Sequence, residues 1–133
     1  MNKIKGYIRY VSSKENISIV EVDVKSTSIF LLLLENPKDV SYLKEGREVS
    51  LIFSPFAVKI SEDKPEKVSI LNILDAYITY IKEGNILSEI VLDFEGDIIK
   101  SYITTLSLKK LSLEIGKKVY LLIDSVDIML EVE

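Results

Sequence analysis

The stretch NKIKGYIRYV at residues 2–11 returns as NILDAYITYI at residues 72–81, with asparagine, tyrosine, isoleucine and tyrosine in the same places. This offset of 70 residues continues without a gap through further identical pairs: Ser18 and Ser88, Asp23 and Asp93, Ile29 and Ile99, Leu43 and Leu113, Gly46 and Gly116, Val49 and Val119, and Leu51 and Leu121. A fixed period of this kind indicates a repeated structural unit. We therefore predict two repeats, residues 1–60 and residues 70–133, joined by a polar linker at residues 61–69.

Each repeat has the pattern of β structure. Residues 17–24, ISIVEVDV, alternate between apolar and polar side chains, as expected for a strand with one buried face. Further strands are predicted at residues 7–11, 29–34, 49–53 and 56–60, and in the second repeat at residues 73–81, 86–94, 98–104, 119–123 and 126–132. After the third strand, residues 37–43 or 107–113 predict a short helix. The expected fold class is all-β: two tandem OB-like five-stranded small barrels, each with a short helix after the third strand.

The size of the repeats predicts that they pack against one another. A unit of about 60 residues buries only about 60% of the surface that its unfolded chain exposes, so it is marginal alone. Residues 29–34 and 120–123 are apolar on both faces of a strand, which predicts contact with another copy or another subunit. We expect a homo-oligomer, either a dimer or a trimer.

Composition excludes most catalytic chemistry. The chain has 133 residues, a formal net charge of -4, and neither cysteine nor histidine. Zinc, iron–sulfur, thiol and imidazole chemistry are therefore excluded, no metal-ion site with protein ligands is expected, and nothing pairs a nucleophile with a base. We predict a protein that is not an enzyme.

The acidic balance and the apolar pattern also limit the partners and the compartment. An acidic chain lacks the broad positive field that drives nucleic-acid binding. No apolar run approaches the roughly 18 residues that a membrane span requires, and the N-terminus lacks the apolar core of a signal peptide. We expect a cytoplasmic protein with no membrane contact.

Residues 101–111, SYITTLSLKKL, change from a strand pattern to a helical pattern, and three hydroxyls lie at the junction: Thr104, Thr105 and Ser107. Hydroxyls beside the free N–H groups of a helix N-terminus are a generic anion cradle. The alternative is that one of them only caps the helical turn. Capping and anion contact are compatible, so both interpretations remain open.

Two motifs in the second repeat resemble the Mop or TOBE domain family. Residues 69–76, SILNILDA, resemble the family opening Ser-Ala-Arg-Asn-x-Leu-x-Gly, and residues 103–107, ITTLS, resemble its Ile-Thr-x-x-Ser. The first repeat fits more loosely, through residues 2–6 and 43–49. The chain thus resembles a tandem Mop/TOBE protein of the molbindin kind, and is similar to the C-terminal di-Mop region of molybdate-responsive regulators.

This resemblance implies an intracellular molybdate- or tungstate-binding protein that serves storage, homeostasis or sensing. The bound oxyanion takes the place of a cofactor, and a molybdate transporter or regulator component is a candidate partner. The oxyanion-binding residues that the resemblance implies are Ser69, Asn72, Thr104, Thr105, Ser107 and Ser125.

Both cationic positions of the family are lost, because its arginine position reads Leu71 and its Lys-Ala pair reads Asp124-Ser125. A carboxylate about 5 Å from a dianion would repel it by roughly 6–7 kcal/mol at an effective dielectric constant near 20. Asp124 must therefore point away from any bound anion, or the pocket is closed to anions.

Two alternatives remain beside the oxyanion-binding protein. One is an oligomeric interaction module of the Mop fold that has lost the anion. The other, ranked last because of the acidic charge, is an OB-type nucleic-acid binder with tyrosines that stack on bases. We expect Tyr7, Tyr10, Tyr77 and Tyr80 to pack in the core and interfaces instead. The lysines, Lys110 among them, are predicted to solvate the surface, although one could reach across an interface and replace a missing cation.

Overall fold

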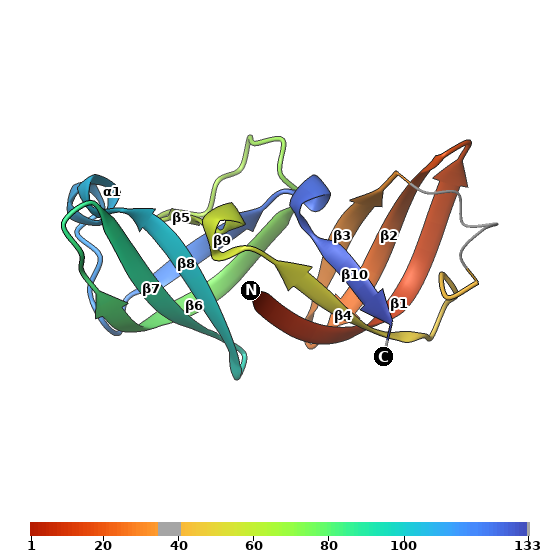
Figure 1. Cartoon of the computed structure of the whole chain (residues 1–133), viewed down its shortest axis with the longest axis horizontal. Helices are drawn as coiled ribbons and strands as arrows, with labels where there is room; N and C mark the ends of the chain where they lie inside the picture. The colour runs from red at the N-terminus through yellow and green to blue at the C-terminus, as the bar shows by residue number, and fades with distance from the viewer. Residues whose placement is uncertain (35–40, 133) are drawn as a thin grey trace.

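The computed structural model describes residues 1–34 and 41–132, and it shows two five-stranded antiparallel sheets that lie side by side, each curled into a small barrel (Figure 1). The first sheet has the strand order β10 (Met129–Val132), β4 (Glu48–Phe53), β1 (Asn2–Lys14), β2 (Ile17–Val24) and β3 (Thr27–Leu33). The second has the order β5 (Lys59–Ser61), β9 (Lys118–Ile123), β6 (Asn72–Lys82), β7 (Leu87–Phe94) and β8 (Asp97–Thr104). The predicted fold class, two tandem OB-like barrels in an all-β chain, is confirmed.

In residues 1–34 and 41–132, helical structure is confined to short segments. The helix predicted after the third strand of the second repeat is α1 (Thr105–Lys110), and two 3-10 turns, η2 (Pro55–Ala57) and η3 (Ser125–Asp127), precede the last strand of each repeat. The helix predicted at residues 37–43 of the first repeat lies mostly outside the described residues. Among the described residues, no helix is both long enough and apolar enough to cross a membrane.

The two halves repeat each other down to single hydrogen bonds. Gly46 donates its N–H to the carbonyl of Ile8 at 2.7 Å, and Gly116 donates to Ile78 at the same distance of 2.7 Å. Both glycines have a positive φ, 84° and 91°, a conformation that strains other residues. The offset of 70 in the sequence therefore corresponds to equivalent positions in two similar barrels.

The four tyrosines are the exception to the predicted packing. Tyr7, Tyr10, Tyr77 and Tyr80 are 51–55% exposed, so the prediction that they pack in the core is wrong, and their packing in an interface between chains stays a prediction. Tyr7 and Tyr77 alternate with the buried Ile8 and Ile78 and so lie on the outer face, and a register irregularity then follows between Ile8 and Tyr10 and between Ile78 and Tyr80. A bulge of this kind inserts a residue and turns the following side chain to the outer face.

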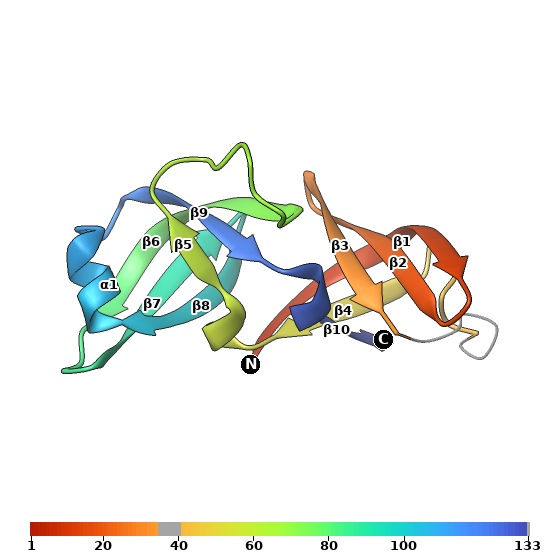
Figure 2. The ribbon, with the colours of Figure 1, turned by 90° about the horizontal axis from the view of Figure 1, so that it is seen from above.

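The last strand of each repeat belongs to the sheet of the other repeat. β10 pairs with β4, where Leu130 lies opposite Leu51, and β5 pairs with β9, where Ile60 lies opposite Leu121. Figure 2 shows β10 beside β4 and β5 beside β9. The repeats have exchanged their fifth strands, an arrangement that the sequence analysis did not foresee.

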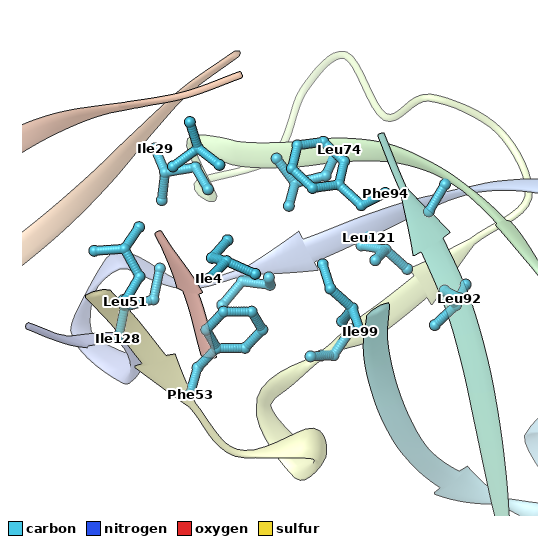
Figure 3. Close-up of a cluster of buried hydrophobic side chains, with 14 of the residues drawn as sticks. Ile4, Ile29, Leu51, Phe53, Leu74, Leu92, Phe94, Ile99, Leu121 and Ile128 are labelled. Carbon is cyan, nitrogen blue, oxygen red and sulfur yellow. The ribbon is translucent and has the colours of Figure 1, made fainter. Parts of the chain in front are cut away.

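The exchange joins the cores of the two barrels. Val58 and Ile128, which precede the exchanged strands, are both buried. Figure 3 shows Ile128 beside Leu51, and Ile4 and Phe53 of the first repeat directed toward Ile99 of the second. The apolar runs at residues 29–34 and 120–123 are thus largely covered within the chain, and Leu34 remains exposed.

Candidate functional site

The hydroxyls of Thr104 and Ser107 form a pair where β8 passes into α1. Thr104 caps the helix, because its Oγ1 accepts the N–H of Ser107 at 3.1 Å, and it donates to Ser107 Oγ at 2.8 Å. Thr104 is exposed and Ser107 is half-buried. This pattern leaves the hydroxyl hydrogen of Ser107 available to a ligand. Since α1 has only six residues, the side chains and not a helix dipole must provide the binding.

Thr105 has a different environment from its two neighbours. Its side chain is buried, lies 2.8 Å from Ser88 Oγ, and donates to the carbonyl of Gly84 at 2.9 Å. Its N–H donates to the carbonyl of Ile86 at 2.7 Å. Thr105 therefore fixes the start of α1 to the β6–β7 turn, and its hydroxyl is already engaged by protein atoms.

Asn72, another predicted anion-binding residue, joins the two repeats. Its Nδ2 donates to the carbonyls of Phe30 at 2.8 Å and Ile123 at 3.0 Å, while its Oδ1 accepts the N–H of Phe30 at 2.7 Å. The side chain is 1% exposed. The buried amide thus binds the outer edge of β3 as a strand would.

Asn2 makes the equivalent bridge in the other direction. Its Nδ2 donates to the carbonyl of Lys100 at 2.9 Å, and its Oδ1 accepts the N–H of Lys100 at 2.8 Å. Asn2 and Asn72 are related by the repeat offset, as are Phe30 and Lys100. The two asparagines therefore form a symmetric joint between the barrels.

The remaining predicted residues lie away from the Thr104–Ser107 pair. Ser69 is exposed in the segment before β6. Ser125 is half-buried in η3, which packs against β3 of the first repeat, and in Figure 1 this blue turn lies beside β3, far from α1. Within one chain, the structure brings together Thr104, Thr105 and Ser107 and separates them from Ser69 and Ser125.

The carboxylate of Asp124, which would repel a bound anion, forms a hydrogen bond within its own turn. It caps η3 by accepting the N–H of Val126 at 3.5 Å. Because η3 lies against the first barrel, this carboxylate belongs to the opposite side of the junction from α1. The repulsion expected between Asp124 and an anion at Ser107 therefore does not arise within the chain.

A cavity of about 320 Å³ lies beside Ser107. One wall comes from the first repeat, at η2 and β5, and the other comes from β8 and α1 of the second. The wall residues are Phe56, Val58, Lys59 and Ile60 from the first repeat, and Tyr102, Ile103, Ser107, Lys110 and Leu111 from the second. Among the described residues, those lining the cavity include two lysines and no carboxylate.

Aromatic contact holds the two walls together. The rings of Phe56 and Tyr102 meet edge to face, with centroids 5.0 Å apart and an interplanar angle of 80°. Ser101, the neighbour of Tyr102, donates its hydroxyl to the carbonyl of Val58 at 2.7 Å. The cavity thus lies where the exchanged strand and the turn before it pack against the second barrel.

Sequence reasoning missed Lys59 and treated Lys110 as a surface residue. Lys59 lies 48 positions before Ser107 and in the other repeat, so only the strand exchange brings the two together. No local motif marks this pairing. Ser107 and Lys110 are three residues apart in a predicted helix, so the sequence could have indicated that these two side chains lie on the same face.

A second cavity, of about 490 Å³, has mixed charge and suits an anion poorly. Asp75, Asp93 and Glu95 line it together with Lys64 and Lys118. Lys118 lies 3.4 Å from Asp75, and the hydrogen bond to this carboxylate raises the pKa of Lys118. The charge of Lys118 is therefore already matched within the chain.

Comparison with known proteins agrees with this architecture. The model of the TOBE domain family matches residues 68–130. By this match, the second repeat resembles a TOBE domain. The matched residues include the Thr104–Ser107 pair, whereas half of the cavity wall comes from the repeat before it.

Curated relatives share the sequence over part of their length. The chain is 38% identical over 87 residues to the molybdenum import ATP-binding protein ModC of Rhizobium johnstonii, and 39% identical over 85 residues to that of Rhizobium etli. These matches cover 63% of this chain and 24% of each relative. The match therefore spans about a quarter of the length of these relatives.

A solved structure matches the whole chain. The cytoplasmic molybdate-binding protein ModG, in a form with molybdate bound, superposes with a TM-score of 0.92 over 99% of this chain and 96% of its own, at 22% identity. At this identity the likeness establishes the fold. The two barrels, with their mutual arrangement, are thus an architecture already seen in a tandem Mop protein.

Proposed function

We propose that this chain is a cytoplasmic binding protein for tetrahedral oxyanions of the molybdate and tungstate class, used for storage or homeostasis. The observation that carries the proposal is the Ser107 hydroxyl at a cavity with no lining carboxylate among the described residues. The TOBE domain, the ModC relatives and the fold shared with a molybdate-binding protein support the choice of anion.

The site provides binding and no chemistry. Thr104 holds Ser107 by two hydrogen bonds, so the Ser107 hydroxyl is oriented before a ligand arrives. An oriented donor in a partly apolar cavity binds a charged oxygen more strongly than it would in water. No base lies beside this hydroxyl in the described part of the chain, so Ser107 acts as a donor and not as a nucleophile.

Calorimetric titration of the full chain with molybdate, tungstate and sulfate tests the proposal. We expect saturable heat with molybdate and tungstate and a weaker response to sulfate. Ser107→Ala should weaken binding about tenfold, because it removes one hydrogen bond to a charged group. Ser12→Ala, at an exposed position in β1, is the matched control and should bind as the wild type does. No heat and no thermal shift at millimolar anion would remove the function.

A second candidate function, an oligomeric interaction module, is favoured by exposed apolar side chains at the cavity and on α1. Phe56 lines the cavity and is 61% exposed, and Leu106, in α1, is 82% exposed. Residues of this size at a rim are common at protein interfaces. Light scattering coupled to size exclusion, with and without molybdate, measures this role independently: a monomer at micromolar concentration in both conditions would exclude it.

A further inference from the structure

We infer that Lys59 and Lys110 supply the positive charge that holds the anion, in place of the arginine and lysine that the sequence lacks. This inference rests on the proposed oxyanion-binding function. It assigns the charged half of the site to two side chains from different repeats, brought to one cavity by the exchange of the fifth strands.

The two lysines share one cavity with Ser107. Lys59 is the first residue of the exchanged strand β5, and Lys110 is the last residue of α1. Both residues line the cavity that Ser107 lines, one from each wall. An anion bound in this space lies within reach of the Ser107 hydroxyl and of both lysine side chains.

Their charges are available, which distinguishes them from other lysines nearby. Lys117 pairs with Glu62 at 2.8 Å, and Lys118 pairs with Asp75 at 3.4 Å. Within residues 1–34 and 41–132, neither Lys59 nor Lys110 forms an ion pair. Binding an anion there therefore breaks no existing salt bridge among these residues.

The charge balance fits a dianion. Two ammonium groups carry the charge that neutralises molybdate or tungstate, whereas a monoanion would leave one positive charge unmatched. The walls between the lysines are formed by apolar groups such as Ile60, Ile103 and Leu111. Both lysines are themselves exposed, so their attraction for the anion acts partly through water and weakens as salt is added.

The first repeat does not offer the same charges. At the repeat offset, Lys59 corresponds to Met129 and Ser107 to Pro37, and the counterpart of Lys110 is Val40. Positions 37 and 40 lie outside the described residues, so this comparison concerns the sequence alone. The charged site is thus a property of the second barrel combined with the strand that the first repeat contributes.

Three matched variants of the full chain test the assignment: Lys59→Met, Lys110→Met and, as control, Lys109→Met. Lys109 is the neighbour of Lys110 on α1, is exposed, and does not line the cavity. Molybdate is titrated into each protein calorimetrically at low ionic strength. We expect each cavity variant to raise Kd about tenfold, the double variant about a hundredfold, and the control less than twofold.

A second pair, Lys59→Arg and Lys110→Arg, separates charge from packing. Both variants keep the charge and should bind within about threefold of the wild type. If the wild type binds molybdate and the Lys→Met cavity variants bind equally well, the inference is wrong and the proposed function stands. If the wild type itself does not bind, the proposed function fails and the lysine assignment fails with it.

Discussion

Asn72 has a structural role that the sequence did not predict. The repeat marks Asn2 and Asn72 as special, and a family motif places Asn72 in an anion site. In the structure both amides instead bind the backbone of an edge strand in the other repeat. This role depends on the docking of two sheets, which no local pattern encodes, so a direct part of Asn72 in anion binding stays a prediction.

Replacing Asn72 with alanine should destabilise the whole chain. The change leaves the N–H and the carbonyl of Phe30 without the partner that the amide provides at a buried joint. We expect a loss of about 2–3 kcal/mol in the free energy of unfolding, measured by urea denaturation. Asn85→Ala, at an exposed turn, is the control and should cost less than about 0.5 kcal/mol. Equal effects of the two variants would show that the joint contributes nothing.

At the scale of single elements, the sequence predicts where strands form but not which sheet they join. Alternation in residues 17–24 and the turns after them depend on local physics, and they appear as β2 and its neighbours. β5 and β10 are short, and their sequence pattern would be the same whether they paired with strands of their own repeat or with strands of the other. The sequence boundaries of the repeats, 1–60 and 70–133, accordingly remain predictions about units of sequence.

The exchange predicts an effect at a distance along the chain. Ile128 belongs to the second repeat in sequence, yet its side chain lies beside Leu51 in the first barrel (Figure 3). Ile128→Ala should cost about 2–4 kcal/mol through the cavity that it creates. In hydrogen exchange, the amides of β4 should lose protection before those of β9.

Val58→Ala is the mirror control for this experiment. Val58 precedes β5, which pairs with β9, so its truncation should lower protection in β9 before β4. If each variant instead loosened only the strands of its own repeat, the strand exchange would be contradicted.

For the whole molecule, two similar barrels have unlike residues in sequence at the positions of the proposed site. Ser107, Lys59 and Lys110 meet at the second barrel, and their sequence counterparts are Pro37, Met129 and Val40. The fold symmetry was visible in the sequence because the core positions repeat. The sequence indicated Ser107 as a residue of the proposed site but not Lys59, because the position of Lys59 depends on the exchanged strand.

This asymmetry predicts a binding stoichiometry. Titration of the full chain with molybdate should saturate at one anion per chain, and affinity should fall with rising ionic strength because salt screens the two exposed lysines. Equilibrium dialysis with metal analysis measures the ratio directly. Two equivalent anions per chain would show that the first repeat also carries a site.

The most direct measurement of the central claim is a crystal of the full chain grown with molybdate and examined by anomalous diffraction at the molybdenum edge. The account predicts an anomalous peak in the cavity between β5 and α1, within hydrogen-bond distance of Ser107 Oγ and close to the ammonium groups of Lys59 and Lys110. A peak beside Asp124 and Ser125 instead, or a fully occupied crystal form with no peak near Ser107, would contradict it.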